Sequence, residues 1–122
     1  MSSNTMQILK RYFPDVADCI QVINNFENDE KREFQDIDQV VTFLETNLKP
    51  ICYQIYRKSP IQKGMTVEFG VLGECQDCIK YEGIADYLMR DLSKSLKNYC
   101  IASASFEPCD SSLRLEIDIW KK

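Results

Sequence analysis

Six cysteines are the residues of this chain best suited to chemistry, and Cys75 and Cys78 form a CxxC pair. Closely spaced thiols of this kind take part in disulfide exchange or bind zinc. The chain has no histidine, which is the usual general base near neutral pH. The sequence therefore excludes Ser-His-Asp and Cys-His nucleophilic sites, and it excludes histidine-ligated zinc, haem or non-haem iron.

The CxxC pair follows a predicted strand and precedes a predicted helix, whose N-terminus would stabilise a thiolate. The run TVEFGVLGECQDCIKYEGIADYL locally resembles the strand, CxxC and helix of the thioredoxin family. The resemblance implies that Cys75 is the nucleophilic thiol and Cys78 the resolving thiol. Glu74 stands where that family has a tryptophan before the first cysteine.

Zinc is a second possible use of the same two thiols. Cys75 and Cys78 would need further cysteine ligands, and Cys100 and Cys109 are candidates. We expect these last two at opposite ends of one strand, too far apart for both to bind one ion. The third interpretation is that the thiols are reduced and have no catalytic or metal role, and this predicts no cofactor.

The elements that must position these thiols differ between the two halves of the chain. Apolar residues recur at steps of three and four over 6–26 and over 37–55, the spacing of amphipathic helices. Pro14 and Pro50 lie inside these patterns and predict a kink in each helix. Asp36 fits the N-cap of a capping box at the start of the second helix.

The second half predicts strands over 65–72, 99–106 and 113–120, with a helix over 81–98 between the first two. We therefore predict one α+β domain over 1–122. A helical hairpin of two kinked helices (1–58) is followed by a β-α-β-β unit (64–122). Its three-stranded sheet is covered by helices.

Charge is unevenly distributed along the chain. The net charge is −4, and the segment 27–38, with six acids and two bases, has the same net charge. We predict that this segment is an exposed loop or a frayed turn. No acid occurs between Glu45 and Glu68, where the four cations are Lys49, Arg57, Lys58 and Lys63. This window predicts a cationic end of the hairpin that binds an anion or an acidic partner. The alternative is that its cations only complement the dipole of a helix C-terminus.

The two predicted helices carry more apolar surface than a three-stranded sheet can cover, and an uncovered apolar face usually marks an interface. The candidate interface residues are Tyr12, Phe13, Phe43, Tyr53, Tyr56 and Trp120. Alternation places Trp120 on the solvent face of the last strand, and tryptophan is enriched at interface hot spots. The alternative is that the helix over 81–98 completes the core and leaves no apolar face exposed.

These observations favour a small, acidic, non-enzymatic protein-interaction module, an adaptor, inhibitor or chaperone-like protein that forms a homodimer. The acidic balance argues against binding to duplex nucleic acid. No apolar run reaches the length of a membrane span and no secretory signal is recognisable, so we expect a cytoplasmic protein. The alternative function is a thiol-dependent protein that uses Cys75 and Cys78, either a zinc-binding module or a thioredoxin-like redox enzyme.

Overall fold

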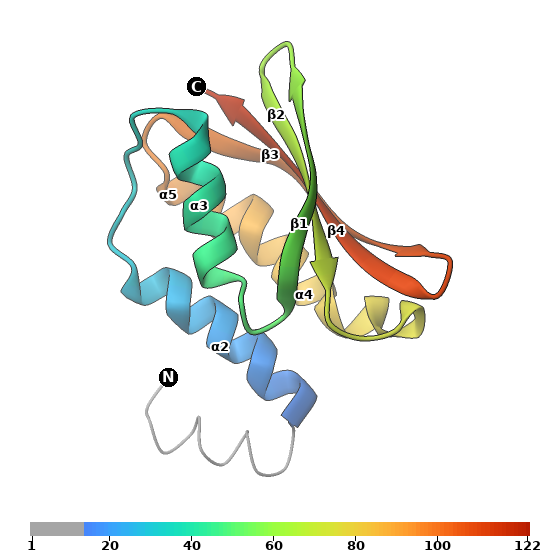
Figure 1. The fold of residues 1–122 in the computed structure, drawn as a ribbon. Coiled ribbons are helices and arrows are strands. Elements are labelled where there is room, and N and C mark those ends of the chain that lie inside the picture. The colour runs from blue at the N-terminus through green and yellow to red at the C-terminus, as the bar shows by residue number, and fades with distance from the viewer. Residues whose placement is uncertain (1–13) are drawn as a thin grey trace.

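The computed structural model describes residues 14–122, with side chains from Ala17 onward (Figure 1). Helices α2 (Pro14–Asn28) and α3 (Ile37–Asn47) precede strands β1 (Cys52–Ile61) and β2 (Gly64–Val71). A 3₁₀ helix, η1 (Cys75–Tyr81), leads into α4 (Glu82–Tyr87), the π-helical turn η2 (Leu88–Leu92) and α5 (Ser93–Ser95). Strands β3 (Tyr99–Cys109) and β4 (Ser112–Lys121) follow. The helix expected before Pro14, with Tyr12 and Phe13, lies outside the described residues.

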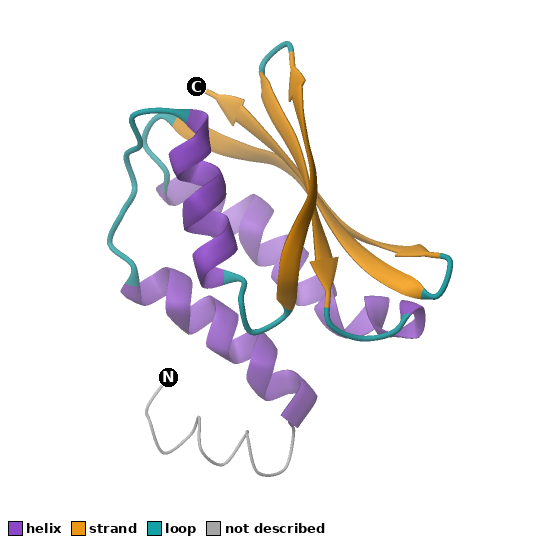
Figure 2. Ribbon diagram, in the orientation of Figure 1, coloured by secondary structure: helices purple, strands orange, loops and turns teal. Residues whose placement is uncertain are grey.

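The four strands form one antiparallel sheet in the order β1-β2-β4-β3. The helices lie together on one side of this sheet (Figure 2). The predicted α+β class is confirmed. The predicted order α-α-β-α-β-β lacks one strand, because β1 precedes β2. In the part of the chain that the structure describes, no helix is long and apolar enough to cross a membrane.

The core forms between the helices and the inner face of the sheet. Val67 and Phe69 of β2, with Leu115 of β4, point inward and are almost fully buried. Helix α3 covers β1 and β2, while α4 and η2 cover β3. Helix α2 packs on α3 and α4. The ring of Phe26 in α2 lies 5.4 Å from that of Phe43 and 6.0 Å from that of Tyr87.

Strand β1 corrects the prediction of a single kinked helix over 37–55. Helix α3 ends at Asn47, and the amides of Ile51 and Cys52 donate to the carbonyl of Leu48 at 3.0 and 2.8 Å. Pro50 ends the helix instead of kinking it, because proline has no amide hydrogen to donate to the preceding turn. The following run CYQIYR is rich in the aromatic and β-branched residues that suit a strand. The sheet therefore has four strands, and 1–58 is not entirely helical.

Smaller differences concern the ends of the other elements. The helical region expected over 81–98 begins earlier, with η1, and ends at Ser95. Strand β3 runs to Cys109, so the turn before β4 is shorter than expected and contains only Asp110 and Ser111. Asp110 has a φ of 56°, a left-handed conformation that aspartate tolerates better than most residues.

The acidic segment between α2 and α3 is exposed at its carboxylates but is not frayed. The guanidinium of Arg32 donates to the carbonyls of Phe26 at 3.0 Å and Asp29 at 2.6 Å. The side-chain amide of Asn98 donates to the carbonyl of Phe34 and accepts from its N–H at 3.1 Å. The two bonds of Asn98 tie the segment to the start of β3. Backbone polar groups need such partners when the chain packs on the core.

Gly64 lies where the start of β2 passes closest to β4, and this tight approach predicts a specific loss of stability. A Cβ at this position would overlap the carbonyl oxygen of Ile119 and lie 3.1 Å from the Cα of Trp120. We expect Gly64→Ala to lower the free energy of unfolding by about 1–3 kcal/mol, because paired backbone cannot move aside. Urea denaturation followed by circular dichroism measures this change.

Gly83→Ala is the matched control. A Cβ at Gly83 in α4 meets nothing within 4 Å, so this change should raise the free energy of unfolding by about 0.5–1 kcal/mol. Equal effects of the two substitutions would contradict the close approach at Gly64.

Candidate functional site

The helices leave one face of the sheet uncovered (Figure 2). Polar, charged and aromatic residues of the strands alternate onto this face. We call it the open face and define it by Tyr53, Tyr56, Arg57, Thr66, Glu68, Gly70, Ser103, Ser105, Glu107, Arg114, Glu116 and Asp118. Alternation explains the arrangement, because every second residue of a strand points away from the core.

Tyr53 and Tyr56 lie together on the open face because β1 has two bulges. Side chains three residues apart in a regular strand point to opposite faces. The register between β1 and β2 shifts once at Tyr53 and once at Tyr56. Each extra residue changes the direction of the side chains after it, so both tyrosines come to lie over Gly70 of β2.

The two tyrosines form an exposed aromatic pair. Their hydroxyl oxygens are 2.8 Å apart, and their rings meet edge to face with centroids 6.2 Å apart. A Cβ on Gly70 would lie 2.7 Å from atoms of both rings, so only glycine leaves them this place. The hydrogen bond to Tyr56 raises the pKa of Tyr53. The side chains stay 52% and 45% exposed, and their ring edges are therefore available for contact.

Two guanidinium groups surround one carboxylate beside the tyrosines. Arg57 Nε and Arg114 Nη1 lie 3.6 and 3.7 Å from Oε2 of Glu68. The guanidinium of Arg114 also lies 4.6 Å from the ring centroid of Tyr56, within the range of a cation–π contact. This arrangement fixes the aromatic pair and places positive charge at the β1 side of the open face.

Carboxylates dominate the β4 and β3 side of the same face. Glu116 lies directly across from Glu68 in the β2–β4 pairing. Burial raises the pKa of Glu116, and the charges of Glu107, Asp118 and Glu68 raise it further. Asp118 accepts hydrogen bonds from Thr66 at 2.6 Å and from Ser103 at 3.1 Å. The open face therefore has an aromatic and cationic side and an acidic side.

The structure separates the four cations that the sequence grouped together. Arg57 and Lys58 lie in β1, Lys63 lies in the turn before β2, and Lys49 lies in the turn after α3. The expected cationic end of a helical hairpin is wrong, because its residues belong to an edge strand and its two turns. Of the four, only Arg57 joins the tyrosines on the open face.

The expected interface on the helices is also corrected. Phe43 is 4% exposed and packs against Phe26 and Phe34, so it is a core residue. Among the described side chains, none of the large apolar residues that are exposed belongs to α2 or α3. Trp120 is half-buried and pairs with Gly64, so it lies at the end of the sheet away from the tyrosines.

Several residues of the open face were not among the sequence candidates. Arg114 and Glu116 alternate with buried residues of β4, and this pattern already placed them toward solvent. No pattern in the sequence pointed to Glu68 or Gly70. The role of Glu68 depends on Arg57 across the strand pair, and the role of Gly70 depends on the two tyrosines. Contacts between strands cannot be read from the sequence of either strand alone.

The CxxC pair lies in η1, directly after the loop that follows β2. Cys78 Sγ donates to the carbonyl of Phe106 at 3.2 Å. Burial raises the pKa of Cys78, and the charges of Cys75, Glu82 and Glu107 raise it further. Cys78 is the thiol to which the resemblance assigns the resolving role, so this shift does not concern the nucleophile. All strand pairs are antiparallel, so the sheet contains no parallel βαβ unit of the kind that precedes the motif in the thioredoxin family.

The other thiols do not gather around the CxxC pair. Cys100 and Cys109 lie near opposite ends of β3, as predicted. Within residues 14–122, no three Cys, Asp or Glu side chains lie together as metal ligands would. All six cysteines belong to this range, and none of them forms a disulfide there.

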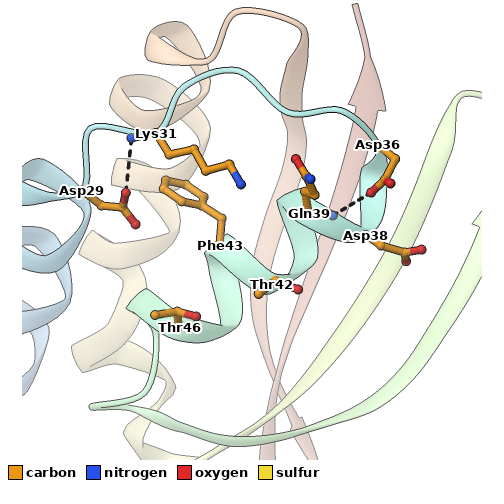
Figure 3. Close-up of a pocket in the computed structure, with 8 residues that line it drawn as sticks. All are labelled: Asp29, Lys31, Asp36, Asp38, Gln39, Thr42, Phe43 and Thr46. Atoms are coloured by element: carbon orange, nitrogen blue, oxygen red, sulfur yellow. Dashed lines mark hydrogen bonds between the residues drawn. The ribbon is translucent and has the colours of Figure 1, made fainter.

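A hollow of about 420 Å³ lies along α3 beside the acidic segment (Figure 3). Two of the three carboxylates that line it, those of Asp29 and Asp36, already have partners in the backbone. Asp36 accepts from the N–H of Gln39 at 3.0 Å and caps α3, and Asp29 accepts from the N–H of Lys31 at 3.2 Å. These bonds give the two aspartates a role in the local structure of the backbone. The open face is therefore the stronger candidate site.

No protein-family model, curated protein or solved structure matches this chain.

The buried thiol of Cys52 provides a test of the thiol environments. Burial raises its pKa to about 12, so almost none of it is thiolate near neutral pH. We expect a thiol reagent at about pH 8 to leave Cys52 unmodified in the folded protein and to modify it only in denaturant. Peptide mapping by mass spectrometry after labelling in both conditions identifies each site.

If Cys75 or Cys78 reacts far faster than the other accessible thiols at pH 7, the redox alternative gains support.

The like charges of Glu116 and Glu68 predict a pH-dependent stability change. A carboxyl whose pKa is raised by folding destabilises the fold while it is charged, and this effect disappears as the pH falls through that pKa. We expect Glu116→Gln to raise the free energy of unfolding by about 0.2–1 kcal/mol at pH 7 and to have little effect at about pH 4. Urea denaturation at both pH values measures this, and Glu45→Gln, on the exposed side of α3, is the control. A gain of the same size at both pH values would contradict the electrostatic cause.

Proposed function

We propose that this protein is a non-enzymatic interaction module that binds another protein through the open face of its sheet. The observation that carries the proposal is the exposed pair of Tyr53 and Tyr56, which two bulges place over Gly70 and beside Arg114. Tyrosine and arginine are enriched at interface hot spots, because they bury large areas and still satisfy their polar groups. An adaptor, an inhibitor or a chaperone-like protein would use such a surface.

The chemistry of the open face supports binding over catalysis. Glu68 lies between Arg57 and Arg114, and Asp118 accepts bonds from Thr66 and Ser103. Carboxylates held in this way are structural partners of the strands next to them. As part of the proposal we expect the protein to act in the cytoplasm, because within residues 14–122 its six cysteines form no disulfide, which suits a reducing compartment.

A second copy of the chain is the partner that we propose. A symmetric dimer uses the same patch on both subunits, so the patch must contain complementary groups. The open face meets this requirement, with Arg57 and the tyrosines on its β1 side and Glu107 and Glu116 on its acidic side.

The strand register supports a particular dimer. Arg57, Glu68, Glu116 and Ser105 lie in one row across the sheet. A two-fold axis parallel to the strands would place β1 of one copy over β3 of the other, with the sheets about 10 Å apart. Arg57 would then face the level of Ser105 in the second copy, two residues from Glu107. In the same row Glu68 would face Glu116 of the second copy, so the contacts of Arg57 at the two edges must outweigh the repulsion between these central carboxylates.

Charge exchange tests this arrangement. We expect the wild-type chain to form a dimer of twice 14.2 kDa in sedimentation equilibrium. Arg57→Glu and Glu107→Arg should each raise the dissociation constant about tenfold or more, because each places like charges opposite one another. A mixture of the two variants should form a mixed dimer, since the exchanged charges are again complementary.

Two further variants separate this surface from general charge effects. Lys49→Glu makes the same charge change outside the open face and should leave the dimer intact. Tyr53→Ser combined with Tyr56→Ser should weaken the dimer without changing the charge. A wild-type chain that stays monomeric at all concentrations would show that the homodimer is wrong. A dimer that both the tyrosine and the charge variants leave unchanged would show that the open face is not its interface.

A further inference from the structure

A groove of about 740 Å³ is lined by residues of the β1–β2 turn, the end of β4 and the first turn of α3. We call it the end groove and define it by Ile37, Lys63, Tyr99, Trp120, Lys121 and Lys122. Its volume is within the range of small-molecule sites, about 300–1,000 Å³. It is separate from the tyrosine pair, because Trp120 pairs with Gly64 while the tyrosines lie over Gly70.

Three of the residues that line the end groove are lysines. No acidic side chain is among the described residues that line it. Within residues 14–122, neither Lys63, Lys121 nor Lys122 forms an ion pair. The chain as a whole has a net charge of −4. The charge at this end of the sheet is positive and is therefore opposite in sign to the net charge. Uncompensated cations around one concave site attract an anion and raise its local concentration.

Aromatic rings provide the apolar part of the groove. Lys63 Nζ lies 4.6 Å from the ring centroid of Trp120, so the ammonium is held at the indole face by a cation–π contact. The indole N–H of Trp120 is buried and has no acceptor among the described residues. Tyr99 and Ile37 add further apolar lining.

We propose that the end groove binds an organic anion that has a flat, apolar body and a carboxylate, sulfonate or phosphate head. The head lies beside Lys63 and Lys121, and the body packs against Trp120. Asp36 and Asp38 are neighbours of Ile37 in the sequence, but they line the hollow along α3 (Figure 3) and are not among the residues that line the end groove. Lys122 has a structural contact as well, since its Nζ donates to the carbonyl of Leu96 at 2.7 Å.

The experiment uses the fluorescence of Trp120, which is the only tryptophan in the chain. The probe is 8-anilinonaphthalene-1-sulfonate, a flat aromatic anion that accepts energy from excited indole. We expect one probe to bind per chain, with energy transfer from Trp120 and weaker binding at high salt. Lys63→Gln combined with Lys121→Gln should raise the dissociation constant about fivefold to tenfold. Trp120→Phe should keep most of the affinity, read from the probe's own emission, and lose the energy transfer.

Matched controls decide between a site and general charge attraction. Lys49→Gln combined with Lys58→Gln removes the same charge outside the end groove and should leave the dissociation constant unchanged. The uncharged analogue N-phenyl-1-naphthylamine should bind at least fivefold more weakly than the sulfonate. The proposal is wrong if both double variants lose affinity equally, if the groove variant binds like the wild type, or if the uncharged probe binds as tightly. Arg57→Glu should not change probe binding, so the result is independent of the proposed dimer.

Discussion

The helices of this protein cover one face of a four-stranded sheet, and the rest of the molecule follows from this one-sided burial. The inner residues of β2 and β4 are sealed against α3 and the helical segment that contains α4. The next residue along each strand must then point to solvent, because strand side chains alternate. The core therefore determines which residues form the open face, although it makes no contact with a partner itself.

Two bulges in β1 modify this simple rule. A regular edge strand would send Tyr53 and Tyr56 to opposite faces, and one of them would enter the core. The bulges bring both rings to one side over Gly70. Bulges are frequent at sheet edges, where they also hinder pairing with another strand. The same feature thus discourages edge-to-edge association and places two aromatic rings together on the open face.

Charge has a different role at each part of the surface. The acids of the segment between α2 and α3 cap a helix or stay in solvent, and Arg32 holds that segment in place. On the open face, guanidinium groups and carboxylates lie on opposite sides of one sheet. At the end groove, lysines gather without acids. The net charge of −4 describes none of these three surfaces, because only the fold decides which charges become neighbours.

The sequence alone determined the elements that depend on local spacing. The α+β class, the N-cap at Asp36 and the strands around Phe69 and Ile117 follow from periodicity and capping. Local spacing did not separate a helix that continues past Pro50 from a strand, because Ile51, Cys52 and Ile55 fit an apolar helix face as well as a pleated strand. Long-range pairing with β2 decided between them.

The site depended still more on tertiary structure. Tyr53, Tyr56 and Trp120 were recognised by residue type, yet their places were decided by strand register. Phe43 has the same residue type as an interface aromatic, but packing against Phe26 and Phe34 made it part of the core. Arg114 and Glu68 acquired a role only beside Arg57 and Tyr56, and Lys63 acquired one only beside Trp120. Residue type can be read along the chain, whereas neighbours across a sheet exist only after the strands have paired.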